Sequence, residues 1–383
     1  MNKIKNKYKE ALILAIDTSC DDTSVAVFKG RRVLSSVISS QVELHKKWGG
    51  VVPTIAKRAH QDNIEKVYQE ALKRARIKEE EIEFVAVTYG PGLAIALEVG
   101  IEFAKNLAYT KKKKLVPINH MEGHMLASFI LNSKGNGAVA LNKEATVFPA
   151  LALLISGNHS EIVYAEDINK YKILGETLDD AAGEAFDKVA RMMNLGYPGG
   201  AIITLLAGRA SKKWSDIKAG LKERDEKKPL AELAGRFGLP VPMMRSKELN
   251  FSFSGLKTAC LYKIKSLREK YPKDTSWSYD FAREFINAVS RSLLTKLGKA
   301  IKLNPEIKSI IVGGGVSNNK YIIREVGTLA KKENKKYFIP ETKFRSDNAG
   351  MIAIAAYYNI NNLENWLEGE KILELDRKPM LRL

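Results

Sequence analysis

Short apolar runs alternate with amphipathic stretches along most of this chain. The segments Leu12–Asp17 and Ser24–Phe28 are apolar and flank the polar segment Thr18–Thr23, so they predict two strands joined by a turn rich in hydroxyl and carboxylate groups. In Gln61–Arg76, apolar side chains recur on one face with helical spacing, and this stretch predicts a helix. The alternation of strands and helices indicates an α/β fold.

The first half of the chain closes with a further unit of strand, helix and strand. Phe84–Thr88 predicts a strand, and the turn Gly90–Gly92 leads into a predicted helix over Ala94–Ala108. Leu115–Ile118 predicts the strand that follows.

The second half repeats the opening pattern. Leu151–Ile155 and Glu161–Tyr164 predict two strands around the small polar segment Ser156–Ser160. The remaining predicted elements of this half are a helix over about Thr177–Asn194, an amphipathic helix over Phe281–Leu297, and a buried strand at Ser309–Val312 that runs into Gly313, Gly314 and Gly315. Small residues at strand ends let a backbone approach phosphates, so three such turns favour a nucleotide between two related halves.

Composition limits the classes of protein to which the chain can belong. It has 383 residues with 45% hydrophobic side chains, which excludes a disordered chain and suggests two domains. The two cysteines, Cys20 and Cys260, are too few and too far apart for a disulfide framework or a cysteine-based zinc site. No apolar run reaches the length of a membrane span, and the basic first ten residues precede no secretory core, so we expect a cytoplasmic protein without membrane contact.

The chain is strongly basic, with 62 Lys and Arg against 44 Asp and Glu and a net charge of +18. Two interpretations stay open at this point, a solvated lysine-rich surface and a surface that binds a polyanion. The segment Lys212–Ala234 is rich in Lys and Glu, and we expect it to be a surface insertion.

The pair His120 and His124 is the clearest local indication of a functional site in the sequence. Two histidines four residues apart point to the same side of a helix, within reach of one metal ion. The alternative is a helix with two unconnected imidazoles. A zinc protease is disfavoured, because such an enzyme needs Glu directly after the first His, whereas Met121 stands there and Glu122 follows.

Two acidic features have a structural and a functional interpretation each. Asp179, Asp180, Glu184 and Asp187 crowd one predicted helix, where a solvated face competes with a small-residue surface that binds ligand hydroxyls. Asp347 precedes a helix of small residues, and from the sequence alone it is predicted to be the N-cap.

Taken together, these motifs resemble the TsaD family, the tRNA N6-threonylcarbamoyladenosine synthase subunits, in its bacterial branch. The segments that carry the resemblance occur in the family's order: Ile16–Thr23, Gly49–Pro53, Gly90–Leu93, His120–His124, Leu154–His159, Asp179–Lys188, Tyr197–Gly200, Phe251–Lys257, Gly314–Asn319 and Ser346–Asn348. The resemblance implies an actin-like (ASKHA) fold with two similar α/β lobes around a central cleft. The first lobe is expected at residues 1–119 plus about 343–383, and the second at 120–342.

The resemblance also implies an activity. The family transfers threonylcarbamoyl from threonylcarbamoyl-adenylate to N6 of adenosine 37 in tRNAs that read ANN codons, and AMP is released. The implied partners are tRNA and companion proteins similar to TsaB and TsaE. The alternatives are an actin-like ATPase or small-molecule kinase, and a non-catalytic scaffold subunit similar to TsaB.

Site residues are carried over position by position. His120, His124 and Asp347 match the positions that hold one divalent metal ion, iron or zinc. The other matches concern the adenylate substrate or ATP/ADP in the cleft: a substrate loop of Leu154, Ile155, Ser156, Gly157 and Asn158, and the nucleotide-binding positions Asp187, Gly200 and Asn319. The chain departs from the family pattern where Asn158 replaces a glycine, where Ile95 and Glu98 replace a glycine and an apolar residue, and where Asp22 replaces Glu.

Overall fold

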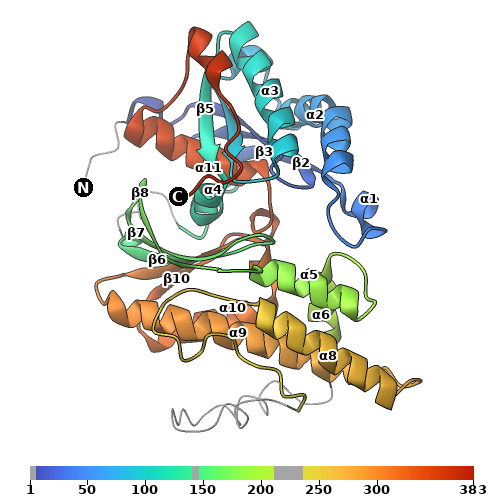
Figure 1. Ribbon diagram of the computed structural model, residues 1–383. Helices are drawn as coiled ribbons and strands as arrows, with labels where there is room; N and C mark the ends of the chain where they lie inside the picture. Colours follow the sequence, from blue (N-terminus) through green and yellow to red (C-terminus); the bar gives the residue numbers. More distant parts are fainter. Residues whose placement is uncertain (1–5, 140–145, 211–235) are drawn as a thin grey trace.

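The computed structural model describes residues 6–139, 146–210 and 236–383. The predicted insertion Lys212–Ala234 lies outside the described residues. Two five-stranded mixed sheets lie one above the other, with helices around and between them (Figure 1).

The first sheet contains the strands of the N-terminal third of the chain. Its order is β3-β2-β1-β4-β5, with β1 antiparallel to β2, β2 antiparallel to β3, and β1, β4 and β5 parallel. The bounds are Leu12–Asp17 for β1, Asp22–Lys29 for β2, Arg32–Ser40 for β3, Phe84–Gly90 for β4 and Lys114–Asn119 for β5.

The second sheet repeats this topology. Its order is β8-β7-β6-β9-β10, with β6 antiparallel to β7, β7 antiparallel to β8, and β6, β9 and β10 parallel. The bounds are Ala150–Ile155 for β6, Ser160–Asp167 for β7, Lys170–Glu176 for β8, Ser309–Gly313 for β9 and Lys336–Phe338 for β10. The duplicated strand order confirms the predicted actin-like architecture of two similar α/β lobes.

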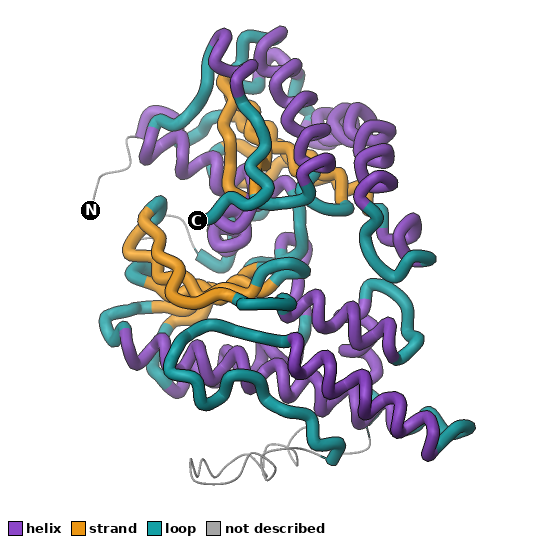
Figure 2. Tube along the Cα trace, in the orientation of Figure 1, coloured by secondary structure: helices purple, strands orange, loops and turns teal. Residues whose placement is uncertain are grey.

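Helices cover both faces of each sheet (Figure 2). In the first half these are α1 (Val42–Lys46), α2 (Pro53–Ala75), α3 (Ala94–Thr110) and α4 (His120–Leu126). In the second half they are α5 (Ala182–Met192), α6 (Gly199–Ala207), α8 (Ser254–Lys270), α9 (Trp277–Leu303), α10 (Lys320–Lys332) and α11 (Ala349–Tyr358), which continues into a π-helical turn at Asn359–Leu363.

The helices α4 and α11 occupy the layer between the two sheets. α2 and α3 pack on the outer face of the first sheet, whereas α11 contacts β1 and β2 from the inner face. α4 contacts α11, β5 of the first sheet, and β6 and β9 of the second. A continuous apolar core joins these elements, with Phe84 of the first sheet and Val163 of the second in the same buried cluster.

Several predicted boundaries are wrong: the helix predicted over Phe281–Leu297, for example, spans Trp277–Leu303. The starts of two other helices have a clear physical reason. The helix predicted over Gln61–Arg76 begins eight residues earlier, at Pro53, because a proline fits the first helical turn and has no amide hydrogen to lose there. The helix predicted from Thr177 begins only at Ala182, since Thr177 forms an isolated bridge with Phe251 instead.

Candidate metal centre

The histidine pair sits on a short helix that begins without a loop after a strand. β5 ends at Asn119, whose side-chain Oδ1 accepts hydrogen bonds from the amides of Met121 (2.8 Å) and Glu122 (3.4 Å). This N-cap starts α4 at His120, so His120 and His124 lie one turn apart on the same face. Their ring centroids are 4.7 Å apart.

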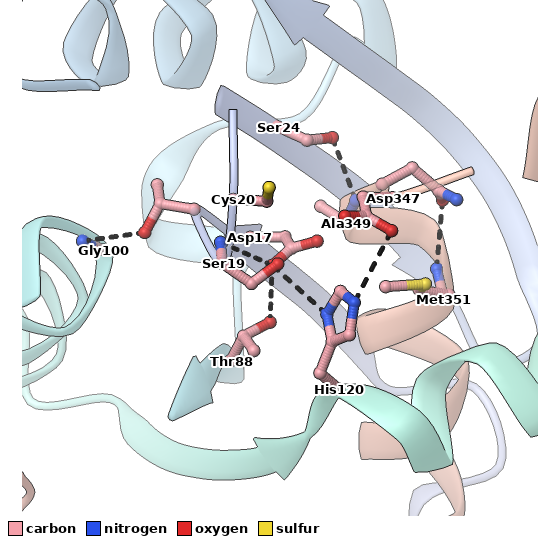
Figure 3. A network of polar contacts seen from close by, with 12 residues as sticks. Asp17, Ser19, Cys20, Ser24, Thr88, Gly100, His120, Asp347, Ala349 and Met351 are labelled. Carbon is pink, nitrogen blue, oxygen red and sulfur yellow. Dashed lines mark hydrogen bonds and ion pairs between the residues drawn. The ribbon is translucent and has the colours of Figure 1, made fainter. Parts of the chain in front are cut away.

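Asp347 reaches the histidines from the opposite end of the chain. Its Oδ1 lies 3.5 Å from His120 Nε2 and 3.1 Å from His124 Nε2. Figure 3 shows the carboxylate turned toward the His120 ring. The structure therefore brings the three predicted residues together.

The prediction that Asp347 is the N-cap of the following helix is wrong. Asn348 is the cap, because its Oδ1 accepts the amide hydrogen of Met351 at 3.1 Å and its Nδ2 donates to Ser346 O at 2.7 Å. The Asp347 carboxylate is thereby left free to face the imidazoles.

The donor atoms of this cluster fit a metal ion. One nitrogen from each imidazole and one carboxylate oxygen of Asp347 all lie within 4.8 Å of one another. Both nitrogens of the fully buried His124 and Nδ1 of His120 have no hydrogen-bond partner, although His124 Nε2 lies so close to the carboxylate. Buried polar atoms without partners are rare, and two imidazoles with one carboxylate are a ligand set that suits zinc or iron.

The electrostatics of the cluster act differently on its three members. Burial alone raises the pKa of Asp347, but the imidazoles beside it outweigh that effect and hold its pKa well below the ordinary range of a carboxyl. Burial lowers the pKa of His124, so that ring is neutral at neutral pH. Burial also lowers the pKa of His120, yet the charge and hydrogen bond of Asp347, together with the charge of Asp17, raise it by more, so a cation there competes with a proton.

Asp17 lies beside the cluster, and the sequence analysis did not select it. It ends β1 and places Oδ1 3.9 Å from His120 Nδ1, as Figure 3 shows. The same oxygen accepts the Thr88 hydroxyl at 2.9 Å and the Ser19 amide at 3.2 Å, whereas Oδ2 has no partner. Its position at the carboxyl end of a buried strand was the signal that could have identified it.

The predicted substrate loop lies against the start of α5. Leu154 and Ile155 are buried at the end of β6. The amide of Gly183 donates to Ser156 O (3.2 Å), and the amide of Glu184 donates to Gly157 O (2.9 Å). A Cβ atom at Gly157 would have no neighbour within 4 Å, so the space above this part of the loop is open.

The loop also lies close to the histidine pair. Its residue His159 donates its backbone amide to Ser156 Oγ at 3.2 Å. Burial, and then the charges of the neighbouring His120 and His124 rings, lower the pKa of His159 to about 4. His159, which follows Asn158, is therefore within electrostatic reach of the histidine pair.

The three predicted nucleotide-binding residues have different surroundings. Asp187 Oδ1 accepts the Gly199 amide at 2.7 Å, and a Cβ atom at the adjoining Gly200 would meet no atom within 4 Å. Asn319 instead caps α10 by accepting the amides of residues 321 and 322, and its Nδ2 donates to Thr204 Oγ1 at 3.0 Å. The Asn319 side chain is thus engaged within the fold.

Asp187 belongs to an acidic region that continues to the metal cluster. Burial raises the pKa of Asp187 to about 6, and the charge of Asp21 raises it as well. Asp21 in turn accepts the Tyr197 hydroxyl at 3.3 Å, and the charge of Asp347 adds to burial in raising its pKa.

The other acidic residues ahead of α5 and on it have structural roles. Asp179 accepts the amides of Phe253 (2.8 Å) and Ser254 (3.3 Å) at the start of α8. Asp180 pairs with Lys188 (2.7 Å) and with Lys257 (2.5 Å). The interpretation as a surface for ligand hydroxyls therefore holds for neither of these two carboxylates.

A family model and named relatives indicate the same family. Residues 32–354 match the family model described as "TsaD: tRNA N6-adenosine threonylcarbamoyltransferase". The chain is 42% identical over 374 residues to the tRNA N6-adenosine threonylcarbamoyltransferase of Thermosipho melanesiensis, with 97% of this chain and 100% of that protein covered. It is 40% identical over 374 residues to the protein of the same name from Streptococcus sanguinis, with 97% of this chain and 98% of that protein covered.

Proposed function

The chain belongs to the TsaD family of tRNA N6-adenosine threonylcarbamoyltransferases, and from this premise we propose how its residues serve the reaction. It is a transferase that modifies tRNA. Neither a small-molecule kinase nor a non-catalytic scaffold is favoured, since the family and its named relatives are transferases and neither alternative gives the histidine pair a role.

We propose threonylcarbamoyl-adenylate as the donor and adenosine 37 of tRNAs that read ANN codons as the acceptor. The lone pair of N6 attacks the carbamoyl carbon, the bond from that carbon to the phosphate oxygen breaks, and AMP leaves while N6 gives up one proton. The exocyclic amine is a poor nucleophile because its lone pair is delocalised into the ring, so positioning and charge stabilisation must supply the rate.

His120, His124 and Asp347 would hold a divalent metal ion, iron or zinc. The observation that carries this proposal is the convergence of their ligand atoms within 4.8 Å, with imidazole nitrogens left without partners. When bound, such an ion supplies Lewis-acid stabilisation of the negative charge that develops on oxygen.

The substrate loop and the acidic region would bind the adenylate. The open space at Gly157 and Gly200 supports close approach of a ligand to the backbone. The Asp187 carboxylate already accepts one amide and can accept further hydrogen bonds from sugar hydroxyls. Leu154, Ile155, Ser156 and Asn158 would line the loop, while Asn319 would contribute by fixing α10 against α6.

The partners follow from charge and from the family. A net charge of +18 supports docking of the tRNA backbone, because Lys and Arg that neutralise phosphates release counterions. We also propose companion proteins similar to TsaB and TsaE. The first lobe would comprise residues 1–119 with 343–383, and the second lobe residues 120–342. We propose a cytoplasmic location. Among the described residues, no helix has the length and apolarity to span a membrane.

A single variant tests the metal-dependent transfer. We expect H124A to lose at least ~100-fold in the rate of threonylcarbamoyladenosine formation, since loss of a ligand costs more than the roughly 10–100-fold typical of residues around a metal's ligands. The assay combines the chain with threonine, bicarbonate, ATP, an adenylate-forming enzyme, the companions and tRNA, and measures the modified nucleoside by mass spectrometry.

The matched control is H45Q, a change at another buried histidine. His45 lies beside Gln41 Oε1 (3.1 Å) and accepts the Val52 amide (3.2 Å), and it is not one of the three residues whose ligand atoms converge. Full activity of H124A, or equal losses in both variants, would contradict the proposal.

A further inference from the structure

The helix α4 presents the histidines on one face and a buried carboxylate on another. Glu122 follows His120 by two residues, which is about 200° around an α-helix, so its side chain points away from the ligand face. Only 7% of Glu122 is exposed. Among the described residues, no lysine or arginine forms an ion pair with it.

Three side-chain donors from two parts of the fold converge on Glu122. Its Oε1 accepts from Asn169 Nδ2 at 2.9 Å and from the Tyr171 hydroxyl at 3.1 Å, and both donors lie at the β7–β8 hairpin of the second sheet. Its Oε2 accepts from Asn359 Nδ2 at 3.1 Å, at the end of α11. A further bond from Asn362 Nδ2 to Asn169 Oδ1, 3.2 Å long, closes the network.

Glu122 therefore lies at the contact between α4 and α11, the helix that follows Asp347. At the next residue, Gly123, an added Cβ would lie 3.1 Å from Ile352 Cδ1 and 3.2 Å from Met351 Cγ, both on α11. This close approach sets the distance between the helices, and the bond from Asn359 to Glu122 fixes how α4 is placed along α11. Since α11 begins two residues after Asp347, the same contacts fix the spacing of the three ligands.

Burial of a carboxylate that is bonded only to neutral donors costs desolvation free energy, and other contacts could join two helices without that cost. Well-packed apolar side chains in place of buried charges are often neutral or stabilising, so the carboxylate is poorly explained by stability alone. Its three hydrogen bonds are directional and therefore fix the orientation of α4 relative to its neighbours. Apolar contacts would fix that orientation less strictly.

We propose that Glu122 is a positioning residue of the metal site, which holds His120 and His124 at the spacing from Asp347 that binding of a cation requires. The inference rests on the proposed metal role of those three residues. Residues around a metal's ligands typically change its affinity by roughly 10–100-fold.

The test measures Zn²⁺ affinity of the full-length protein without tRNA, by competition with a chromophoric chelator, together with the visible spectrum of the Co²⁺-loaded protein. In E122Q, one of the two carboxylate oxygens becomes an NH₂ group, which is a donor and faces the donor of Asn359 or Tyr171. In N359A, one of the three donors to Glu122 is removed. We expect both variants to bind Zn²⁺ at least ~10-fold more weakly and to shift the Co²⁺ bands.

The matched control is N361A in the same π-helical turn. Asn361 is buried like Asn359, but its Nδ2 donates to Tyr357 O (2.9 Å) and it does not touch Glu122. We expect N361A to lower the melting temperature as much as N359A while its Zn²⁺ affinity stays that of the wild type.

The outcomes separate the two proposals. Wild-type protein that binds no stoichiometric Zn²⁺ would defeat the metal role itself. Wild-type binding with unchanged affinity in E122Q and N359A, or with an equal loss in N361A, would overturn the positioning role of Glu122. If E122Q does not fold, N359A alone decides between these results.

Discussion

Glu161 carries a carboxylate with an unusual environment for a single residue. It lies on β7 with 8% of its surface exposed, and its Oε2 has no hydrogen-bond partner. Burial, and then the charge of Glu176, raise the pKa of Glu161 to about 7, while Arg382 acts in the opposite direction. Because the pKa is raised in the folded state, the native protein binds this proton more tightly than the unfolded chain does. The contribution of this group to stability is therefore present at low pH and is lost as the pH rises through 7.

This environment predicts a pH-dependent effect of E161Q. The neutral amide resembles the protonated acid, so the variant is expected to match the wild type near pH 4.5 and to be more stable by about 2 kcal/mol at pH 8. Urea unfolding at the two pH values measures the difference. E269Q is the control, because Glu269 lies on α8 and is exposed. A gap that does not grow with pH would contradict the assignment.

Asp347 and Asn348 show what the sequence can and cannot predict at this scale. Asp and Asn are equally good N-caps, so the local sequence selects a cap but not which of the two neighbours fills it. The choice follows from the imidazoles that face Asp347, and these lie more than half a chain away. The resemblance to the family selected Asp347 as a ligand, whereas Asp17 was not selected, although its place at the end of a buried strand could have identified it.

Among the elements, the start of α5 lies in close contact with the predicted substrate loop. An added Cβ at Gly183 would lie 2.4 Å from Ser156 O and 2.8 Å from Gly157 Cα. These are backbone atoms that cannot rotate away, so the helix and the substrate loop would have to separate.

We therefore expect G183A to fold but to lose about 2 kcal/mol of unfolding free energy from overpacking. Displacement of the loop should also raise the KM for the adenylate by at least ~10-fold. Calorimetry and steady-state kinetics measure the two effects. G255A is a matched control, since an added Cβ at Gly255 would meet no atom within 4 Å. An unchanged KM in G183A would show that this loop does not contact the adenylate.

At the level of elements, the sequence predicted best those with a strong apolar pattern. Leu12–Asp17 was predicted with its observed bounds because its side chains are nearly all buried. Arg32–Ser40 was not predicted as a strand, because four serines on a half-exposed strand weaken the alternation. The helix Lys320–Lys332 was also missed, since its buried residues are few and lysines flank them.

In the whole molecule, the C-terminal tail connects the two sheets. The amide of Lys378 donates to Tyr89 O (2.7 Å), the amide of Gly92 donates to Pro379 O (3.2 Å), and Asn119 Nδ2 donates to Arg382 O (3.1 Å). The Arg382 guanidinium then contacts Glu176 on β8. The tail passes so close to Gly90 that an added Cβ there would overlap Lys378 O.

Truncation after Leu375 is expected to lower the free energy of unfolding by about 2 kcal/mol, from three lost hydrogen bonds worth roughly 0.5–1.5 kcal/mol each. Urea unfolding followed by circular dichroism measures this loss. R382Q serves as a comparison, because it keeps the backbone bonds and removes only the exposed ion pair, and its loss should stay below about 1 kcal/mol. Equal midpoints for the truncated and full-length proteins would show that the tail does not hold the sheets together.

The duplicated architecture could be predicted because each half repeats strand, polar loop and strand. The arrangement of the halves could not, since it depends on α4 and α11, whose side chains are buried almost throughout and show no outward periodicity.

The wide separation of the ligands along the chain has a consequence for biosynthesis. His120 and His124 leave the ribosome long before Asp347, and more than half of the polypeptide lies between the pair and the aspartate. A nascent or prematurely terminated product that stops before Asp347 has only two of the three ligands. On the proposal that these three residues hold a cation, such a product could not complete the site, and the cation would bind only after translation is nearly complete.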